Sequence, residues 1–253
     1  MKRYESYIFD LYGTLIDILT DETSPAFWRG IAGLYGCRGA KYGPRTMRES
    51  YLALCREEED ALRRRTGEEY PEIELRTVFR RLLTEAKGTP ATDDPDGFVE
   101  AAAAVFRVLS RKRFNVYPGV HDALKELRGR GARLFLLSNA QEVFTLDELR
   151  LAGLNGYFER VFISSAHGIR KPQPAFLEKL IEECGIDRGR AVMVGNDIFS
   201  DMRIADACGI DGILLNTDGL SGEEIEMRIK ECGIESPERL TPILSGDIRE
   251  LLG

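Results

Sequence analysis

Polar side chains that could take part in catalysis or ligand binding follow several apolar runs in this chain of 253 residues. In sequence order they are Asp10, Thr14, Ser138, Asn139, Lys171, Asn196, Asp197 and Asp201. Because the carboxyl ends of parallel strands meet at one edge of a sheet, we expect these side chains to lie close together. The chain has only 2 histidines, so we expect carboxylates to supply its chemistry.

Asp10 is the candidate nucleophile. A carboxylate can attack phosphorus or carbon and form a covalent aspartyl intermediate, which splits one difficult displacement into two easier steps. Gly13 and Thr14 follow Asp10, and the glycine predicts a turn directly after the first apolar run. The alternative interpretation is a turn or helix-capping aspartate without a chemical role.

Asp197 and Asp201 are the candidate metal ligands, four residues apart after an apolar run that ends at Gly195. Mg²⁺ is a hard cation that prefers oxygen ligands, binds few protein groups and keeps several waters. We expect one acid to bind Mg²⁺ directly and the other through water. A solvated helix start is the alternative.

Short apolar runs alternate with helical stretches along most of the chain. Strands are expected at residues 7–10, 133–137, 161–164, 191–195 and 212–215. Helices are expected at residues 120–129, 174–184 and 223–231. This alternation predicts an α/β fold with a Rossmann-like, doubly wound and mostly parallel sheet.

The segment between residues 17 and 115 has a different sequence pattern. Strand-like runs vanish, and residues 48–65, 72–87 and 96–111 have helical patterns. The segment is too long for a loop, which predicts an inserted α-helical cap subdomain at residues 18–114 and a core formed by residues 1–17 and 115–253.

The overall charge and hydropathy exclude several partners. A net charge of -7 gives no general attraction to nucleic acid or to an anionic membrane. The first residues lack the features of a signal peptide, and no apolar run approaches ~20 residues. We expect a soluble cytoplasmic protein, a monomer or homodimer, that acts on a small molecule.

In their order and spacing, the polar groups resemble the motifs of the haloacid dehalogenase superfamily, whose members are hydrolases with a Rossmann-like core. The resemblance covers the whole predicted core, whereas the predicted cap resembles the family only in position and helical character. It implies that Ser138 binds an oxygen of the transferred group and that Lys171 pairs with the nucleophile. The alternatives are a helix cap for Ser138 and a surface lysine for Lys171. Asn139 either orients substrate or forms an Asx turn.

The resemblance also implies a Mg²⁺ site. Its candidate ligands are Asp10, the backbone carbonyl of Tyr12, Asn196, Asp197 and Asp201. Many relatives have an aspartate directly after the glycine, where this chain has Asn196. Whether Asn196 or Asp197 faces the metal therefore stays open.

Tyr12 is the main departure from the family pattern. Family phosphatases usually carry a second aspartate at this position as the general acid and base, and a phenol with an ordinary pKa near ~10 is a poor base at neutral pH. Family dehalogenases carry tyrosine there, so this residue favours dehalogenation. The candidate catalytic residues are Asp10, Tyr12, Thr14, Ser138 and Lys171. Family dehalogenases work without Mg²⁺, however, and lack the two acids that follow Gly195 in this chain.

A Mg²⁺-dependent phosphatase that acts through an aspartyl-phosphate is therefore the favoured function. The alternatives are a metal-independent 2-haloacid dehalogenase with Asp10 as carbon nucleophile, and a catalytically weak or binding-only protein.

Overall fold

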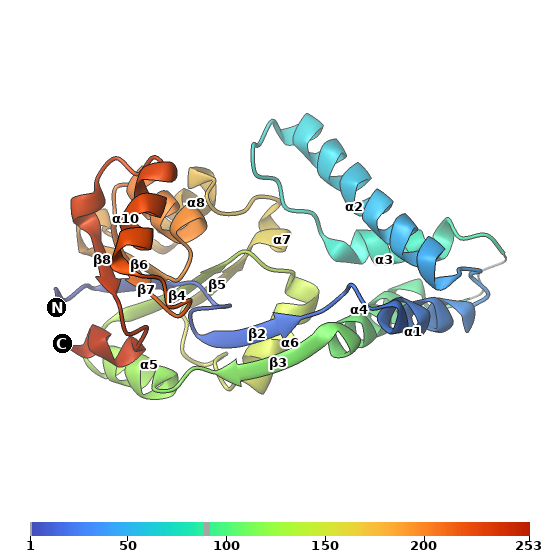
Figure 1. Ribbon diagram of the computed structural model, residues 1–253, viewed down its shortest axis with the longest axis horizontal. Coiled ribbons are helices and arrows are strands. Elements are labelled where there is room, and N and C mark those ends of the chain that lie inside the picture. Colours follow the sequence, from blue (N-terminus) through green and yellow to red (C-terminus); the bar gives the residue numbers. More distant parts are fainter. Residues whose placement is uncertain (1, 89–91) are drawn as a thin grey trace.

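The computed structural model describes residues 2–88 and 92–253, and its six-stranded parallel sheet lies in the part of the molecule drawn at the left of Figure 1. The strand order is β5-β4-β1-β6-β7-β8. These strands are β1 (Ser6–Phe9), β4 (Arg133–Ser138), β5 (Arg160–Ile163), β6 (Ala191–Gly195), β7 (Asp211–Leu215) and β8 (Leu240–Ile243). The predicted α/β fold with a mostly parallel sheet is confirmed.

Helices cover both faces of this sheet. Tyr7 and Phe9 pack with α5 (Val120–Gly129) and α6 (Glu142–Leu151), whereas Ile8 packs with α8 (Pro174–Cys184) and α9 (Arg203–Ala207). Neighbouring residues of β1 thus face opposite layers, which is why this short strand is apolar on both sides. The smaller elements are α7 (Ser164–His167), α10 (Gly222–Glu231), the π-helical turn η2 (Ile198–Met202) and the 3-10 turns η1 (Arg188–Arg190), η3 (Pro237–Arg239) and η4 (Ile248–Leu252).

A second buried cluster lies within the helices drawn at the right of Figure 1. These are α1 (Pro25–Gly36), α2 (Pro44–Thr66), α3 (Leu75–Thr84) and α4 (Pro95–Ser110). Phe106 of α4 occupies the centre of the cluster, with ring centroids 4.9 Å from Phe27 and 5.3 Å from Tyr51 and Phe79. The helical character predicted for this segment is confirmed, and α1 is an additional helix. Its start is set by the Ser24 cap and Pro25.

An antiparallel ribbon connects the helices to the sheet region. It pairs β2 (Ile16–Thr20) with β3 (Arg111–Val116). The prediction that strands are absent between residues 17 and 115 is therefore wrong, and the helix expected at 96–111 ends at Ser110. Both strands are partly exposed and carry charged residues, so they lack the continuous apolar run that marks a buried strand.

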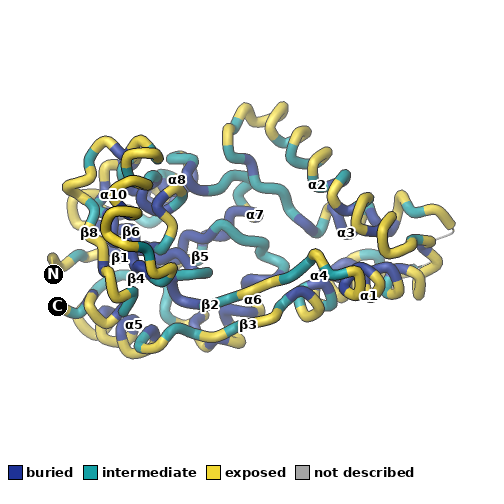
Figure 2. The backbone as a smooth tube through the Cα atoms, in the orientation of Figure 1, coloured by how far each residue is buried: buried dark blue, intermediate teal, exposed yellow. Residues whose placement is uncertain are grey.

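The two buried clusters meet at α4 and α6. Phe144 of α6 belongs to the helical cluster and stacks on Phe106, with centroids 6.1 Å apart. Figure 2 shows buried segments both in the sheet region and among the helices. The ribbon spans both proposed boundaries, so the division at residues 17/18 and 114/115 stays a prediction. In the two described stretches, no helix combines the length and apolarity needed to cross a membrane.

The aromatic cluster gives the first testable prediction. Phe106→Ala removes the central ring and leaves a cavity, so we expect a loss of about 3–5 kcal/mol in the free energy of unfolding, measured by chemical denaturation. Val108 lies on the same helix but is 66% exposed, and Val108→Ala should change the stability by less than about 0.5 kcal/mol. Equal effects of the two substitutions would contradict the assignment of Phe106 to the cluster centre.

Candidate active site

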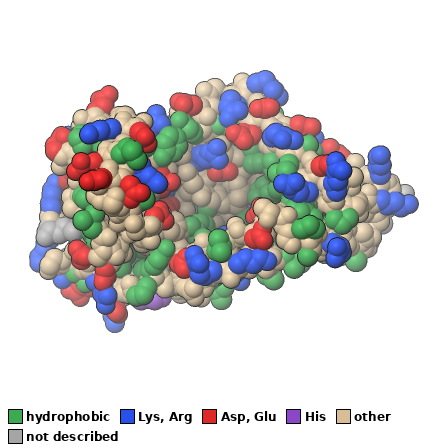
Figure 3. Space-filling model, viewed as in Figure 1, with side chains coloured by type: hydrophobic (Ala, Val, Ile, Leu, Met, Phe, Trp, Pro, Cys, Tyr) green, Lys and Arg blue, Asp and Glu red, His purple; other side chains and the backbone are tan. Residues whose placement is uncertain are grey.

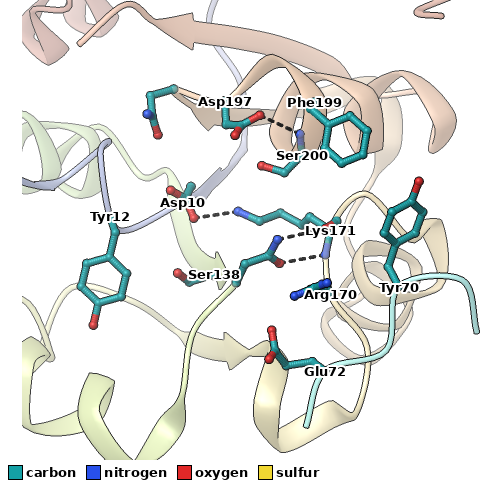
Figure 4. Close-up of a pocket in the computed structure, with 12 residues that line it drawn as sticks. Asp10, Tyr12, Tyr70, Glu72, Ser138, Arg170, Lys171, Asp197, Phe199 and Ser200 are labelled. Carbon is teal, nitrogen blue, oxygen red and sulfur yellow. Dashed lines mark hydrogen bonds and ion pairs between the residues drawn. The ribbon is translucent and has the colours of Figure 1, made fainter. Parts of the chain in front are cut away.

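A pocket of about 470 Å³ opens at the carboxyl ends of β1, β4 and β6. Figure 3 shows that the molecule is hollowed between the sheet region and the helices. The pocket is lined by Asp10, Tyr12, Tyr70, Glu72, Ser138, Asn139, Arg170, Lys171, Asn196, Asp197, Phe199 and Ser200 (Figure 4). The structure therefore brings together residues from all the polar groups that the sequence singles out.

A buried ammonium lies between two carboxylates at the base of this pocket. Lys171 Nζ donates to Asp10 Oδ1 and Asp201 Oδ1, both at 2.7 Å, and to the Leu137 carbonyl oxygen at 2.8 Å. Burial works against the charged ammonium, but the two carboxylates more than offset it and raise the pKa of Lys171. At Asp201, by contrast, burial raises the pKa of the carboxyl, although the Lys171 ammonium opposes this shift.

Asn139 holds the backbone of Lys171 in place. Its side-chain Nδ2 donates to the Lys171 carbonyl oxygen at 2.9 Å, and its Oδ1 accepts from the Lys171 amide at 2.8 Å. Both polar ends of the Asn139 amide are thus occupied by the protein. This geometry favours a positioning role over direct contact with substrate.

Two glycines allow close approaches around the nucleophile. Gly13 has φ +85°, and a Cβ there would lie 2.5 Å from Asn196 Nδ2. A Cβ on Gly195 would overlap the Asp201 carboxylate. The Thr14 hydroxyl lies 3.3 Å from Asp10 Oδ2 and 3.1 Å from Asn196 Oδ1. It therefore links the polar residues that follow β1 to those that follow β6.

Ser138 supplies a free hydroxyl at the pocket wall. The residue is buried at the end of β4, and its Oγ has no hydrogen-bond partner in the described part of the chain. A buried hydroxyl without a partner is costly, and the cost is removed when a ligand oxygen accepts its hydrogen bond. The position fits the predicted contact with the transferred group.

Oxygen donors suited to a hard cation line the same pocket. Asp10, Asn196 and Asp197 contribute side-chain oxygens. Among the described residues, Asp10 Oδ2 has only the long contact with the Thr14 hydroxyl. Asp201 has both oxygens occupied, one by Lys171 and the other by the Asp197 amide at 3.0 Å. Within residues 2–88 and 92–253, no three His, Cys, Asp or Glu side chains are arranged as a metal site. A cation here would therefore need amide, backbone or water oxygens as well, as Mg²⁺ accepts.

The Tyr12 side chain points away from Lys171 (Figure 4). Its hydroxyl donates to Glu148 and lies 3.2 Å from Thr145 Oγ1. Glu148 is itself paired with Arg107 at 2.8 Å. Burial, reinforced by Glu148, raises the pKa of Tyr12 far above its usual range although Arg107 opposes this shift, so the phenol keeps its proton.

Several pocket residues lie outside the predicted set. Tyr70, Glu72, Arg170, Phe199 and Ser200 line the wall. Tyr70 and Glu72 come from the loop after α2, which is joined to residues 168–170 by backbone hydrogen bonds. No local pattern reveals such a contact, whereas Arg170 could have been suspected from its position next to Lys171.

Comparison with known proteins agrees with this geometry. Residues 4–209 match the model of the haloacid dehalogenase-like hydrolase family. The chain belongs to this family. It is therefore a hydrolase, and the resemblance seen in the motifs is confirmed.

Two curated relatives show moderate similarity to this chain. A phosphoserine phosphatase of Thermus thermophilus is 33% identical over 174 residues, which is 69% of this chain but only 62% of that relative, less than two thirds of its length. A phosphoglycolate phosphatase of Nitrosococcus oceani is 27% identical over 249 residues, covering 97% of this chain and 98% of the relative.

The fold is also shared with solved structures of the family. A HAD phosphatase from Thermococcus onnurineus has a TM-score of 0.60 at 19% identity, with 98% of each chain covered. At this identity the likeness concerns the fold alone.

Because Lys171 pairs with two buried carboxylates, we expect the stability of the protein to depend strongly on it. Lys171→Met leaves Asp10 and Asp201 buried without their cation, and we expect a loss of about 3–5 kcal/mol in the free energy of unfolding. Lys179→Met on the exposed side of α8 is the control and should cost less than about 0.5 kcal/mol. A loss at Lys171 no larger than at Lys179, measured by urea denaturation, would contradict the proposed electrostatic role.

Proposed function

We propose that this hydrolase is a Mg²⁺-dependent phosphatase that acts on a small phosphorylated metabolite through an aspartyl-phosphate intermediate. The observation that carries the proposal is the Asp10 carboxylate, held against Lys171 at the base of a pocket into which the unpaired Ser138 hydroxyl can donate. Both curated relatives described above are phosphatases, which supports the same reaction class.

The reaction has two displacement steps. An Asp10 carboxylate oxygen forms a bond to phosphorus while the bond from phosphorus to the ester oxygen breaks. A water then attacks the phosphorus of the aspartyl-phosphate, which releases phosphate and regenerates the Asp10 carboxylate. Lys171 orients Asp10, and Ser138 donates a hydrogen bond to a phosphoryl oxygen.

Asp10, the Tyr12 carbonyl, and Asn196 or Asp197 would hold the metal. When bound, Mg²⁺ would neutralise charge on the phosphoryl oxygens. The Asp201 carboxylate is committed to Lys171 and to the Asp197 amide, which favours an indirect role for it.

Tyr12 does not supply the proton for the leaving oxygen in this arrangement, because its hydroxyl is bound to Glu148. We propose that pocket water supplies that proton. The tyrosine was the feature that favoured the dehalogenase alternative, and its orientation toward Glu148 removes the reason to place it beside a leaving halide.

A substrate screen tests the proposed function. The protein is incubated with phosphate esters and with 2-haloacids, each with Mg²⁺ or with EDTA, and free phosphate and halide are measured. We expect phosphate release that requires Mg²⁺ and that Asp10→Asn abolishes. Asp122→Asn, on the exposed face of α5, is the matched control and should retain activity.

Two results of this screen would overturn the proposal. Halide release would support the dehalogenase alternative, and phosphate release that persists in EDTA would remove the metal from the mechanism. Absence of any turnover would support a binding-only protein.

A further inference from the structure

Arg170 places a second cation in the active-site pocket. Lys171, the next residue, is committed to Asp10 and Asp201 at the base. Arg170 lines the same pocket, and in residues 2–88 and 92–253 no carboxylate forms an ion pair with its guanidinium within 4.0 Å. Of the two cationic side chains that line the pocket, Arg170 is thus the one whose charge remains available to a ligand.

Backbone hydrogen bonds fix the chain around Arg170, and they do not use the N–H donors of its side chain. The Arg170 amide donates to the Tyr70 carbonyl oxygen at 3.0 Å, and the Arg170 carbonyl accepts from Gln173 at 3.0 Å. Pro71 and Ile169 form an antiparallel bridge beside it. In Figure 4 the guanidinium lies between Lys171 and Glu72, on the side of the pocket formed by the loop after α2.

Glu72 is the acidic neighbour of Arg170 but is held by other groups. Its Oε2 accepts from Ser164 Oγ at 3.1 Å, and its Oε1 accepts from Gln141 Nε2 at 3.0 Å. Burial raises the pKa of Glu72, and the nearby Arg170 opposes this shift. The Glu72 carboxylate therefore moderates the positive charge at Arg170 without forming an ion pair with it.

We propose that Arg170 is a second-anion subsite that binds the carboxylate of a phosphorylated carboxylic acid. The planar guanidinium presents paired N–H donors that match a carboxylate. A single cation beside an acidic residue can balance one negative charge, whereas a second phosphate group would bring more charge than this wall can neutralise. This inference rests on the proposed phosphatase function and names its substrate class.

The pocket has room for a small phosphorylated acid. Its volume is about 470 Å³, and Tyr70 and Phe199 line it with ring centroids 6.0 Å apart. Their edge-to-face contact joins the loop after α2 to the turn η2. Asp10 and Arg170 both line this pocket, so the proposal places the phosphate of one small substrate against Asp10 and its carboxylate against Arg170.

Matched substrates test the charge preference. Phosphoglycolate and the phosphate ester of glycolamide have nearly the same shape and differ in the charge at the end opposite the phosphate. We expect the wild type to prefer the acid, and Arg170→Gln to lower the ratio of kcat/KM for acid over amide by about 10- to 100-fold, mainly through KM. Arg170→Lys should keep part of the preference, because it retains the charge but loses the paired donors.

Arg65→Gln on the exposed surface of α2 is the control and should leave the ratio unchanged. Equal rates on acid and amide in the wild type, or equal loss on both in Arg170→Gln, would overturn the subsite while leaving the phosphatase proposal intact. A stronger preference for ethylene glycol bisphosphate would overturn the assignment to a carboxylate.

A binding measurement separates this inference from the proposed function. Calorimetry with Asp10→Asn and with Asp10→Asn/Arg170→Gln reports the affinity for phosphoglycolate without turnover. Should the wild type hydrolyse no phosphate ester, the proposed function fails. Binding of phosphoglycolate that is weaker by about 10-fold or more in the double variant than in Asp10→Asn would still support the subsite. Equal affinity of the two variants would overturn it.

Discussion

The buried ion pairs of Lys171 with Asp10 and Asp201 are the interaction on which the rest of the site depends. Two neighbouring carboxylates repel each other, and burial raises the pKa of the Asp201 carboxyl. The Lys171 ammonium lies 2.7 Å from both carboxylates, offsets this repulsion and holds Asp10 at the base of the pocket. Removing the cation would therefore affect both the stability of the core and the chemistry of the pocket.

The fold brings these charges together from distant parts of the chain. Asp10 follows β1, Asp201 lies in η2 after β6, and Lys171 precedes α8. Because β1 lies between β4 and β6, the ends of the three strands form one edge, and Ser138 of β4 joins the same pocket. The sheet thus fixes the base of the pocket, while the loop after α2 completes its wall.

The sequence predicted the base of the pocket better than its wall, for a physical reason. Asp10 and Ser138 end continuous apolar runs, and such runs mark buried parallel strands whose ends meet. Arg170 and Tyr70 come together through a loop contact between distant segments, which leaves no periodic signal. The β2–β3 ribbon was missed because its strands are partly exposed and carry charged residues that interrupt the apolar pattern. The direction of the Tyr12 side chain depends on Glu148, which no local pattern connects to it.

Trapping the covalent intermediate tests the central claim most directly. The wild-type protein is mixed with a phosphate ester that it hydrolyses, quenched in acid during turnover and digested, and the peptide that contains Asp10 is examined by mass spectrometry. The account predicts a phosphoryl group on Asp10 during turnover that disappears once the substrate is consumed. Phosphate release with Asp10 unmodified throughout, or with the phosphoryl group on another residue, would contradict it.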